Sequence, residues 1–384
     1  MKFSIHRQAF IKSLNDVQRA VASKTTIPIL TGIKLVVTND ALILTGSDSE
    51  LTIESTISTD EEESQLIIQK TGAVVLPSRF FGEIIKKLPS DTVTIEVNDH
   101  FQATISSGSA SFTLNGIDVY EYPHLPEIDS DQVIVLPVPL LRQMIQQTII
   151  SASVEESRPI LSGIHFVLKD NLLKAVATDS HRLSQRIIPL QIDALENSLE
   201  YEFTIPRKTL IELSRIIEGL ETIELSIKEN LALFQTEHLS FFSRLLDGRY
   251  PDVERLIVVE NTTQLVIQAN ELLNAAERAS LMSNANSSKV AKITLSSDSV
   301  RLTSQSPEIG TVEEELSYES TEGSPMEISF NPDYLKDALR TFGHSEIVIT
   351  FNSVIRPFKL EPKDPLSSID NSFVQLITPV RTFA

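Results

Sequence analysis

The stretch Pro28-Ile29-Leu30-Thr31-Gly32-Ile33 returns 131 residues later as Pro159-Ile160-Leu161-Ser162-Gly163-Ile164. The next matching segments lie at the same distance, because Leu44-Thr45-Gly46-Ser47-Asp48-Ser49 corresponds to Val176-Ala177-Thr178-Asp179-Ser180. The chain has 384 residues, so three units of about this length would fill it. A period this long is typical of a repeated whole domain, whereas solenoid units are roughly 20–50 residues long.

A second repeated unit, a strand followed by a proline and a helix, occurs three times. Its prolines are Pro77, Pro206 and Pro332, which are 129 and 126 residues apart. Proline is favoured at the first helical position, so we expect each of them to lie in the first turn of a helix. Segments such as 92–97 and 222–227 alternate between polar and apolar residues, which predicts strands.

These patterns predict an α+β fold made of three similar domains, each with two helices on one face of antiparallel sheets. Each domain is expected to begin with a strand, at residues 3–5, 133–136 and 265–267. The boundaries are placed near Leu125-Pro126-Glu127 and Arg255-Leu256-Ile257. The predicted domains are residues 1–126, 127–254 and 255–384.

The composition excludes several classes of protein. The chain has no Cys, which excludes disulfides, thiolate zinc sites and a cysteine nucleophile. The first residues lack the apolar core of a signal peptide, and no apolar run approaches the roughly 18 residues needed to cross a bilayer. We therefore expect a soluble cytoplasmic protein that has no membrane partner.

The charge of the chain is unevenly distributed. The formal net charge is −19, yet the six predicted helices together carry +6 and the remainder −25. In three helices two cations lie seven residues apart, opposite an apolar stripe, and therefore on one face. One interpretation is an ordinary solvated helix surface. The repetition favours a surface that contacts phosphates. The predicted helices are residues 6–24, 79–88, 139–153, 206–219, 269–284 and 331–343.

Motifs for catalysis are missing from the sequence. It has no phosphate-binding glycine loop of either common type, and its seven His lack the His-Glu-x-x-His spacing of a zinc site. We expect no metal and no cofactor. Asp179-Ser180-His181 contains the residue types of a catalytic triad, but neighbours in sequence rarely adopt triad geometry. A polar turn between strands is the favoured interpretation, and a hydrolase using Asp179 and His181 is the alternative.

In its motifs and their order, the whole chain resembles the bacterial replicative sliding clamp family, the beta subunit of DNA polymerase III. The ending Pro379-Val380-Arg381-Thr382 is similar to that of clamps from Gram-positive bacteria. The segments that carry the resemblance are residues 1–5, 27–30, 44–48, 176–183, 205–208, 246–252 and 376–381.

The resemblance implies a homodimer joined head to tail, with six domains closed into a ring around double-stranded DNA. Such a ring is a non-enzymatic processivity factor that slides without reading sequence. It tethers the replicative DNA polymerase, and the clamp loader and other proteins with clamp-binding peptides share its pocket. A scaffold of the same fold that binds only protein is the second hypothesis.

The candidate DNA-facing residues come from two sources. The resemblance implies Lys24, Arg79, Arg207 and Lys208, and the helical spacing adds Lys12, Arg19, Lys86 and Arg215. Arg158 is followed by Pro159 and Ile160, where some relatives have a pair of Tyr, so contact of this loop with DNA stays open.

The resemblance also implies two protein-binding surfaces. The residues matching the dimer interface are Phe112, Leu114, Leu281 and Met282. Residues 109–114 are expected to form an edge strand there, and the tail Thr382-Phe383-Ala384 is expected to end outside the pocket. The residues matching the peptide pocket are Leu161, Thr178, His181, Arg182, Leu183, Pro251, Leu256, Ile377, Thr378, Pro379, Val380 and Arg381.

Overall fold

The computed structural model describes residues 1–22, 24–123, 133–155, 157–190, 200–257, 262–283, 289–364 and 372–381. The predicted boundary at Leu125-Pro126-Glu127 and the tail Thr382-Phe383-Ala384 lie outside these residues. The chain forms two compact units. The first comprises residues 1–138 and 211–245, and the second comprises residues 139–210 and 246–384.

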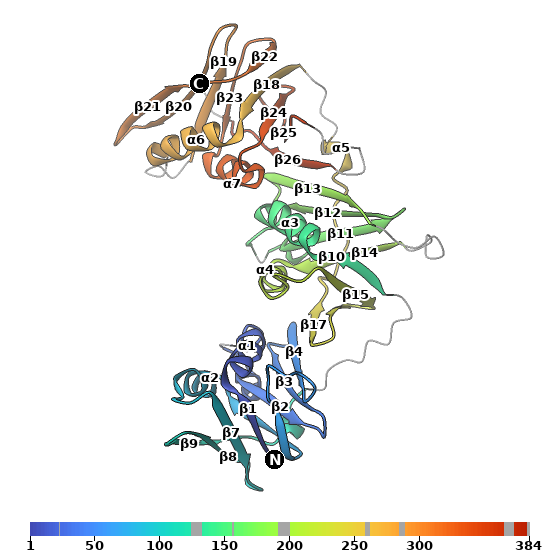
Figure 1. Ribbon diagram of the computed structural model, residues 1–384. Coiled ribbons are helices and arrows are strands. Elements are labelled where there is room, and N and C mark those ends of the chain that lie inside the picture. The colour runs from blue at the N-terminus through green and yellow to red at the C-terminus, as the bar shows by residue number, and fades with distance from the viewer. Residues whose placement is uncertain are drawn as a thin grey trace. The chain divides into compact units, whose positions relative to one another are not determined.

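The first unit contains two antiparallel sheets and two helices, α1 (Arg7–Gln18) and α2 (Ser78–Lys87) (Figure 1). The five-stranded sheet has the order β5 (Ile67–Lys70), β1 (Lys2–His6), β7 (Thr92–Val97), β8 (Gln102–Ser107) and β9 (Ala110–Asn115). The eight-stranded sheet has the order β10 (Ile134–Pro137), β15 (Thr222–Lys228), β16 (Leu231–Gln235), β17 (Leu239–Arg244), β4 (Leu51–Ser58), β3 (Ala41–Ser47), β2 (Gly32–Val37) and β6 (Gly72–Pro77).

The second unit contains a nine-stranded and a four-stranded sheet. Its helices are α5 (Glu254–Ile257), α6 (Ala269–Ser283) and α7 (Pro332–Phe342), while α3 (Val138–Thr148) and α4 (Arg207–Ile216) begin in one unit and end in the other. The nine-stranded sheet has the order β14 (Tyr201–Pro206), β11 (Gly163–Lys169), β12 (Leu172–Thr178), β13 (Arg182–Pro189), β26 (Phe373–Ile377), β25 (Phe358–Pro362), β24 (Glu346–Phe351), β18 (Thr263–Gln268) and β22 (Ser320–Gly323). The four-stranded sheet has the order β21 (Gly310–Glu315), β20 (Val300–Ser306), β19 (Ala291–Leu295) and β23 (Met326–Phe330).

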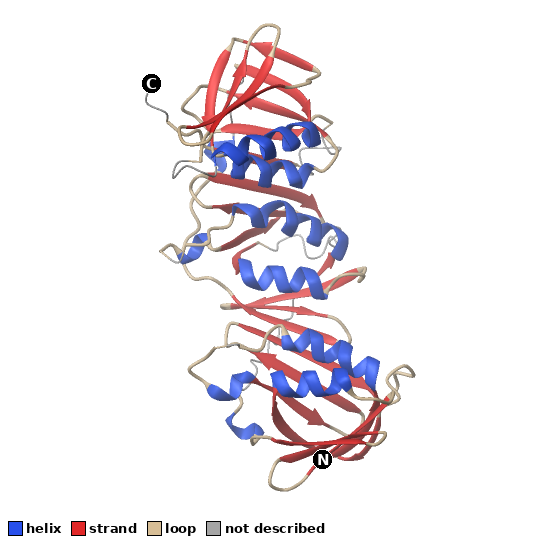
Figure 2. Ribbon diagram, turned by 90° about the vertical axis from the view of Figure 1, so that its left-hand side faces the viewer, coloured by secondary structure: helices blue, strands red, loops and turns tan. Residues whose placement is uncertain are grey.

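Helices pack in pairs against the sheets. In Figure 2, α1 and α2 lie side by side near the N-terminus, and α6 and α7 do so in the C-terminal part. In the first pair the ring of Phe10 is 6.1 Å from that of Phe3 and 5.8 Å from that of Phe81, edge to face, so one aromatic chain joins both helices to β1. No helix among the described residues is long and apolar enough to cross a membrane.

The two borders between sequence repeats are ordinary strand pairs. Strand β17 pairs with β4, and strand β26 pairs with β13, both antiparallel (Figure 1). Each sheet therefore continues from one repeat into the next. This continuity is why the compact units divide the second repeat instead of following the repeat borders.

The glycine of the repeated Pro-Ile-Leu-x-Gly stretch is required by a close backbone approach. In both copies the stretch forms a 3₁₀ turn, η1 (Pro28–Thr31) and η4 (Pro159–Leu161), that leads into a strand. A Cβ on Gly32 would lie 3.0 Å from the carbonyl oxygen of Leu76, and one on Gly163 would lie 2.3 Å from that of Ile205. A side chain at either place would push the paired strand away.

Two expectations about the helices were wrong. Only Pro332 lies in the first turn of a helix, whereas Pro77 and Pro206 are the last residues of β6 and β14. These two prolines pair opposite Gly32 and Gly163, so the ladder extends through them. The first helix was expected to reach residue 24 but ends at Gln18, with Arg19 as its C-cap. Lys24 therefore lies beyond the helix.

Candidate functional site

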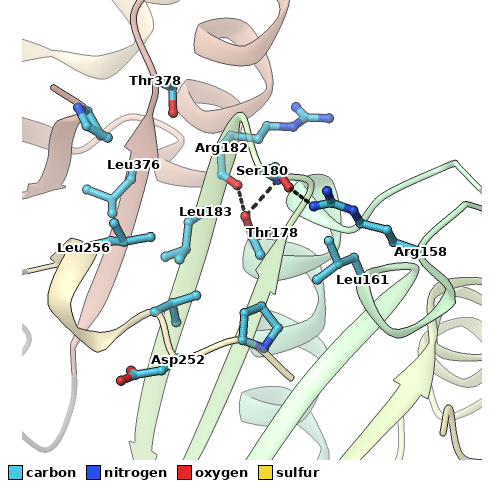
Figure 3. A pocket seen from close by; sticks show the side chains of 13 residues that line it. Arg158, Leu161, Thr178, Ser180, Arg182, Leu183, Asp252, Leu256, Leu376 and Thr378 are labelled. Carbon is cyan, nitrogen blue, oxygen red and sulfur yellow. Dashed lines mark hydrogen bonds between the residues drawn. The ribbon is translucent and has the colours of Figure 1, made fainter. Parts of the chain in front are cut away.

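The second unit contains a pocket of about 290 Å³ between the end of β12, the end of β26 and α5. In Figure 3, Leu183, Leu256 and Leu376 point into the same space from three different elements. Half of the polar lining residues, Thr178, Ser180 and Arg182, lie in or next to the turn between β12 and β13. The lining residues are Arg158, Leu161, Thr178, Ser180, Arg182, Leu183, Pro251, Asp252, Val253, Leu256, Pro357, Leu376 and Thr378.

The turn at the rim is held by its own side chains. Thr178 Oγ1 accepts from the Ser180 N–H at 3.1 Å and donates to the Arg182 carbonyl at 2.7 Å (Figure 3). Asp179 Oδ1 accepts from the backbone N–H groups of His181 at 2.9 Å and Arg182 at 3.0 Å. Asp179 thus closes a turn, as predicted for the Asp-Ser-His segment.

Arg182 connects this turn to helix α7. Its guanidinium contacts the carboxylates of Asp179 at 3.0 Å and Asp337 at 2.7 Å. It also lies 4.6 Å from the centre of the Tyr334 ring, a cation–π distance. The side chain of Arg182 is 15% exposed, so these partners fix its position.

A buried apolar cluster forms the floor of the pocket. Around Leu161 and Leu183 it contains Val176, Tyr250 and Val253, with Val374 and Leu376 of β26. The His165 ring stacks on Tyr250 at 4.6 Å, and its Nδ1 is hydrogen-bonded to Thr204 Oγ1 at 3.0 Å. Burial lowers the pKa of His165 and raises that of Tyr250, so both rings are neutral at pH 7.

Seven of the twelve predicted pocket residues line this cavity, namely Leu161, Thr178, Arg182, Leu183, Pro251, Leu256 and Thr378. The other five lie beside it. The His181 ring faces that of Tyr334 at 6.3 Å, and Ile377 belongs to the core of the third repeat. Pro379 is buried, Arg381 is exposed, and the Val380 N–H donates to the Ser329 carbonyl, which places the tail along β23.

Sequence reasoning missed six lining residues. Ser180, Asp252 and Val253 lie in or next to matching motifs and could have been found there, and Leu376 lies in the last one. Pro357 carries no signal in the sequence. Arg158 was expected only as a possible DNA contact. In the structure its side chain lines the pocket, with Nη1 3.4 Å from Ser180 Oγ (Figure 3).

The candidate DNA-facing cations are all at least partly exposed. Lys12 lies on α1, Arg79 and Lys86 on α2, and Arg207, Lys208 and Arg215 on α4. Lys24 is exposed beyond α1. Arg19 and Arg215 share one partner, because each lies 2.9 Å from a different oxygen of the Glu212 carboxylate. Together the two cations carry one uncompensated positive charge.

The candidate dimer residues lie on and near free sheet edges. Strand β9 ends the five-stranded sheet, as expected for residues 109–114, and β21 begins the four-stranded sheet. Phe112 on β9 is 42% exposed and Leu281 near the end of α6 is 65% exposed, while Leu114 and Met282 are half-buried.

The structure offers no metal centre within its described residues, where no group of three or more His, Asp or Glu is placed to hold an ion. An apolar pocket with a few oriented polar groups suits a short peptide, and exposed helix cations suit phosphates.

Three family descriptions match successive parts of the chain. They are the N-terminal, central and C-terminal domains of the DNA polymerase III beta subunit, at residues 1–126, 135–252 and 254–381. The beta sliding clamps of Bacillus subtilis and Staphylococcus aureus are each 42% identical to the chain, over the full length of both proteins.

Solved structures agree with these matches. The DNA polymerase III beta chain of Streptococcus pneumoniae is 39% identical with a TM-score of 0.95, covering 99% of this chain and 100% of that one. The sliding clamp of Bacillus subtilis is 42% identical with a TM-score of 0.94, covering 100% of both. The chain therefore belongs to the beta sliding clamp family, the non-catalytic processivity subunits of DNA polymerase III.

Proposed function

We propose that two copies of this chain join head to tail into a closed ring of six repeats around double-stranded DNA in the cytoplasm. In this proposal the helix cations contact phosphates without base reading. The pocket of the second unit binds peptide segments of the replicative DNA polymerase, the clamp loader and other partner proteins. The observation that carries the ring is a pair of sheet edges, β9 and β21, that have no partner strand on one side among the described residues.

Within the chain, every repeat border is made by corresponding strands. The last strand of the second repeat, β17, pairs with β4 of the first repeat. In the same way the last strand of the third repeat, β26, pairs with β13 of the second repeat. The strand of repeat one that corresponds to β17 is β9, and the strand of repeat three that corresponds to β13 is β21. Each of these has one neighbour among the described strands.

Pairing β9 of one copy with β21 of another would repeat the same border between molecules. It would join a five-stranded to a four-stranded sheet and give nine strands, the number in the sheet that crosses the border within the second unit. The contact is head to tail, and two such contacts close a ring. It would also remove two free edges that favour aggregation.

Side chains support this pairing. Phe112 stands opposite Ile105 in the β8–β9 hairpin, as Phe241 stands opposite Phe234 in the β16–β17 hairpin. Phe241 pairs with Ile53 across the internal border and is fully buried. Phe112, which is 42% exposed, would be buried in the same way by a second copy.

The absence of Cys allows a direct test of the ring. The double variant Thr113→Cys/Thr311→Cys places one thiol on β9 and one on β21. We expect mild oxidation to give a covalent dimer on a non-reducing gel, and each single variant to stay monomeric on the gel. The oxidised protein should remain on nicked circular DNA and leave it after linearisation. Failure to form the covalent dimer, in protein that is dimeric in solution, would contradict this pairing.

The pocket supports an extended peptide with apolar anchors. Leu161, Leu183 and Leu256 provide apolar walls, and Arg158 and Thr178 provide polar groups at the rim. A clamp-binding peptide derived from the replicative polymerase should bind the wild-type protein in a calorimeter, and Leu183→Ala should weaken that binding. Equal affinity for both proteins would show that the peptide binds elsewhere.

The hydrolase hypothesis is excluded because the family is non-catalytic. The structure explains the triad-like residues in another way. The Asp179 carboxylate accepts from two backbone N–H groups and from Arg182, and the His181 ring faces Tyr334. These residues shape the turn beside the pocket.

A further inference from the structure

The helix cations of the third repeat are neutralised by carboxylates of the same repeat. Helices α6 and α7 carry three cations, Arg278, Lys336 and Arg340. Arg278 makes a two-pronged contact with Glu314, with Nε 2.8 Å from Oε2. Lys336 lies 2.7 Å from Asp333, and Arg340 lies 2.9 Å from Glu277. Each charge is thus compensated before any ligand arrives.

Two of these ion pairs, and a hydrogen bond of Lys336, also join different elements of the repeat. Arg278 connects α6 to β21, and Arg340 connects α7 to α6. Lys336 donates to Ser280 Oγ on α6 at 2.9 Å, and its side chain is only 14% exposed. The hydrogen bond from Arg278 lowers the pKa of Glu314, so this carboxylate stays ionised at neutral pH. The cations here serve packing within the repeat.

Four cations on helices of the first two repeats are different from these three. Lys12 on α1, Arg79 and Lys86 on α2, and Arg207 on α4 have no carboxylate within 4.0 Å among the described residues. The Nζ of Lys86 has a neutral partner, Gln18 Oε1, at 3.5 Å. A phosphate can approach these cations without displacing a protein carboxylate.

We propose that DNA is held by the first two repeats of each subunit, and that the third repeat contributes no net phosphate contact. The inference rests on the proposed ring. A phosphate that binds Arg278 must first displace Glu314, so little counterion release from DNA accompanies the exchange. A ring of six similar repeats is then electrostatically two-fold, with two positive arcs separated by two neutral ones.

The salt dependence of duplex binding counts phosphate contacts. The slope of log K against log salt changes by about 0.9 for each contact on duplex DNA. The dimer carries each substitution twice, so we expect Arg79→Gln/Lys86→Gln to lower the magnitude of the slope by up to about 3.6, and Arg278→Gln/Glu314→Gln to leave it unchanged. A fluorescently labelled 30-base-pair duplex and the intact dimer serve as the binding partners, and dimer mass is checked for each variant.

Removing the carboxylate partner of a cation should change the salt slope in the opposite direction. Glu314→Gln keeps the shape of the side chain and removes the partner of Arg278 in both subunits, so the slope should steepen by up to about 1.8. The matched control is Glu313→Gln, which makes the same charge change on the same strand. Glu313 points to the opposite face and pairs with Arg301 on β20, so the control should not steepen the slope.

The outcomes separate the two proposals. A wild-type protein without salt-dependent duplex binding would contradict DNA encirclement itself. A normal wild-type slope that falls in Arg278→Gln/Glu314→Gln would overturn only the neutrality of the third repeat. An unchanged slope in Glu314→Gln, or an equal rise in Glu313→Gln, would overturn it as well.

Discussion

Arg182 and Asp337 are 155 residues apart in the sequence, yet Nη1 of the first lies 2.7 Å from Oδ2 of the second. The contact joins the turn beside the pocket, in the second repeat, to helix α7 in the third. The side chains are 15% and 37% exposed, so solvent screens the pair only in part. The rim of the pocket therefore depends on a contact between two repeats.

The first prediction concerns this contact. Asp337→Asn should weaken binding of a polymerase-derived peptide several-fold. Arg182 would lose its ionised partner on α7, and the turn that contains it would become less ordered. The free energy of unfolding should fall by about 1 kcal/mol, as for a half-buried charged hydrogen bond. Calorimetric titration and urea denaturation measure the two effects. Asp364→Asn, an exposed carboxylate elsewhere in the third repeat, is the control and should change neither.

The second prediction ranks two neighbours on the same turn. Leu183 lines the pocket and is 3% exposed, whereas His181 lies beside it against Tyr334. Truncating a buried apolar wall removes contacts with the ligand, so Leu183→Ala should reduce peptide affinity at least tenfold. His181→Ala should reduce it less. A larger effect of His181→Ala in the same titration would place the peptide along the tail instead of in the cavity.

Sequence patterns predicted local features well and long-range contacts poorly. The repeat, the strands and the Asp-Ser-His turn follow from neighbours in sequence, since alternation and turn chemistry act over a few residues. The shared Glu212 carboxylate lies 193 residues from Arg19, and no periodicity marks such a pair. Pro357 lies at the pocket because β25, which it precedes, pairs with β26. No local sequence pattern predicts this strand pairing.

The apolar periodicity also failed to predict where the first helix ends. The apolar stripe of the first helix continues past Gln18 through Val21, so periodicity alone extends it. In the structure the chain leaves the helix where Gly46 approaches it, since a Cβ on Gly46 would lie 2.1 Å from the Val17 carbonyl oxygen. Tertiary packing against β3 thus ends the helix, and Lys24 lies beyond it as a result.

The third prediction tests the glycine of the repeated stretch. Gly163→Ala places a methyl group 2.3 Å from the Ile205 carbonyl oxygen, so β11 and β14 must separate. The free energy of unfolding should fall by about 1–3 kcal/mol, as for overpacked sites. Gly219→Ala is the control. It has a φ of 87° with no neighbour within 4 Å, so only backbone strain of about 1 kcal/mol applies. Equal losses in urea denaturation would show that close packing is not the cause.

The fourth prediction separates a DNA clamp from a scaffold that binds only protein. Changing Lys12, Arg79, Lys86 and Lys208 together to Glu should abolish low-salt binding of duplex DNA, because phosphates would face carboxylates. Peptide binding in the pocket should persist, which shows that the protein is folded. The matched control changes four strand cations, Lys70, Lys169, Lys228 and Lys292, to Glu and alters the net charge equally. Fluorescence anisotropy with one labelled duplex measures both. If net charge alone governed binding, the two quadruple variants would lose affinity for the duplex equally. That result would contradict the prediction that the helix cations contact DNA.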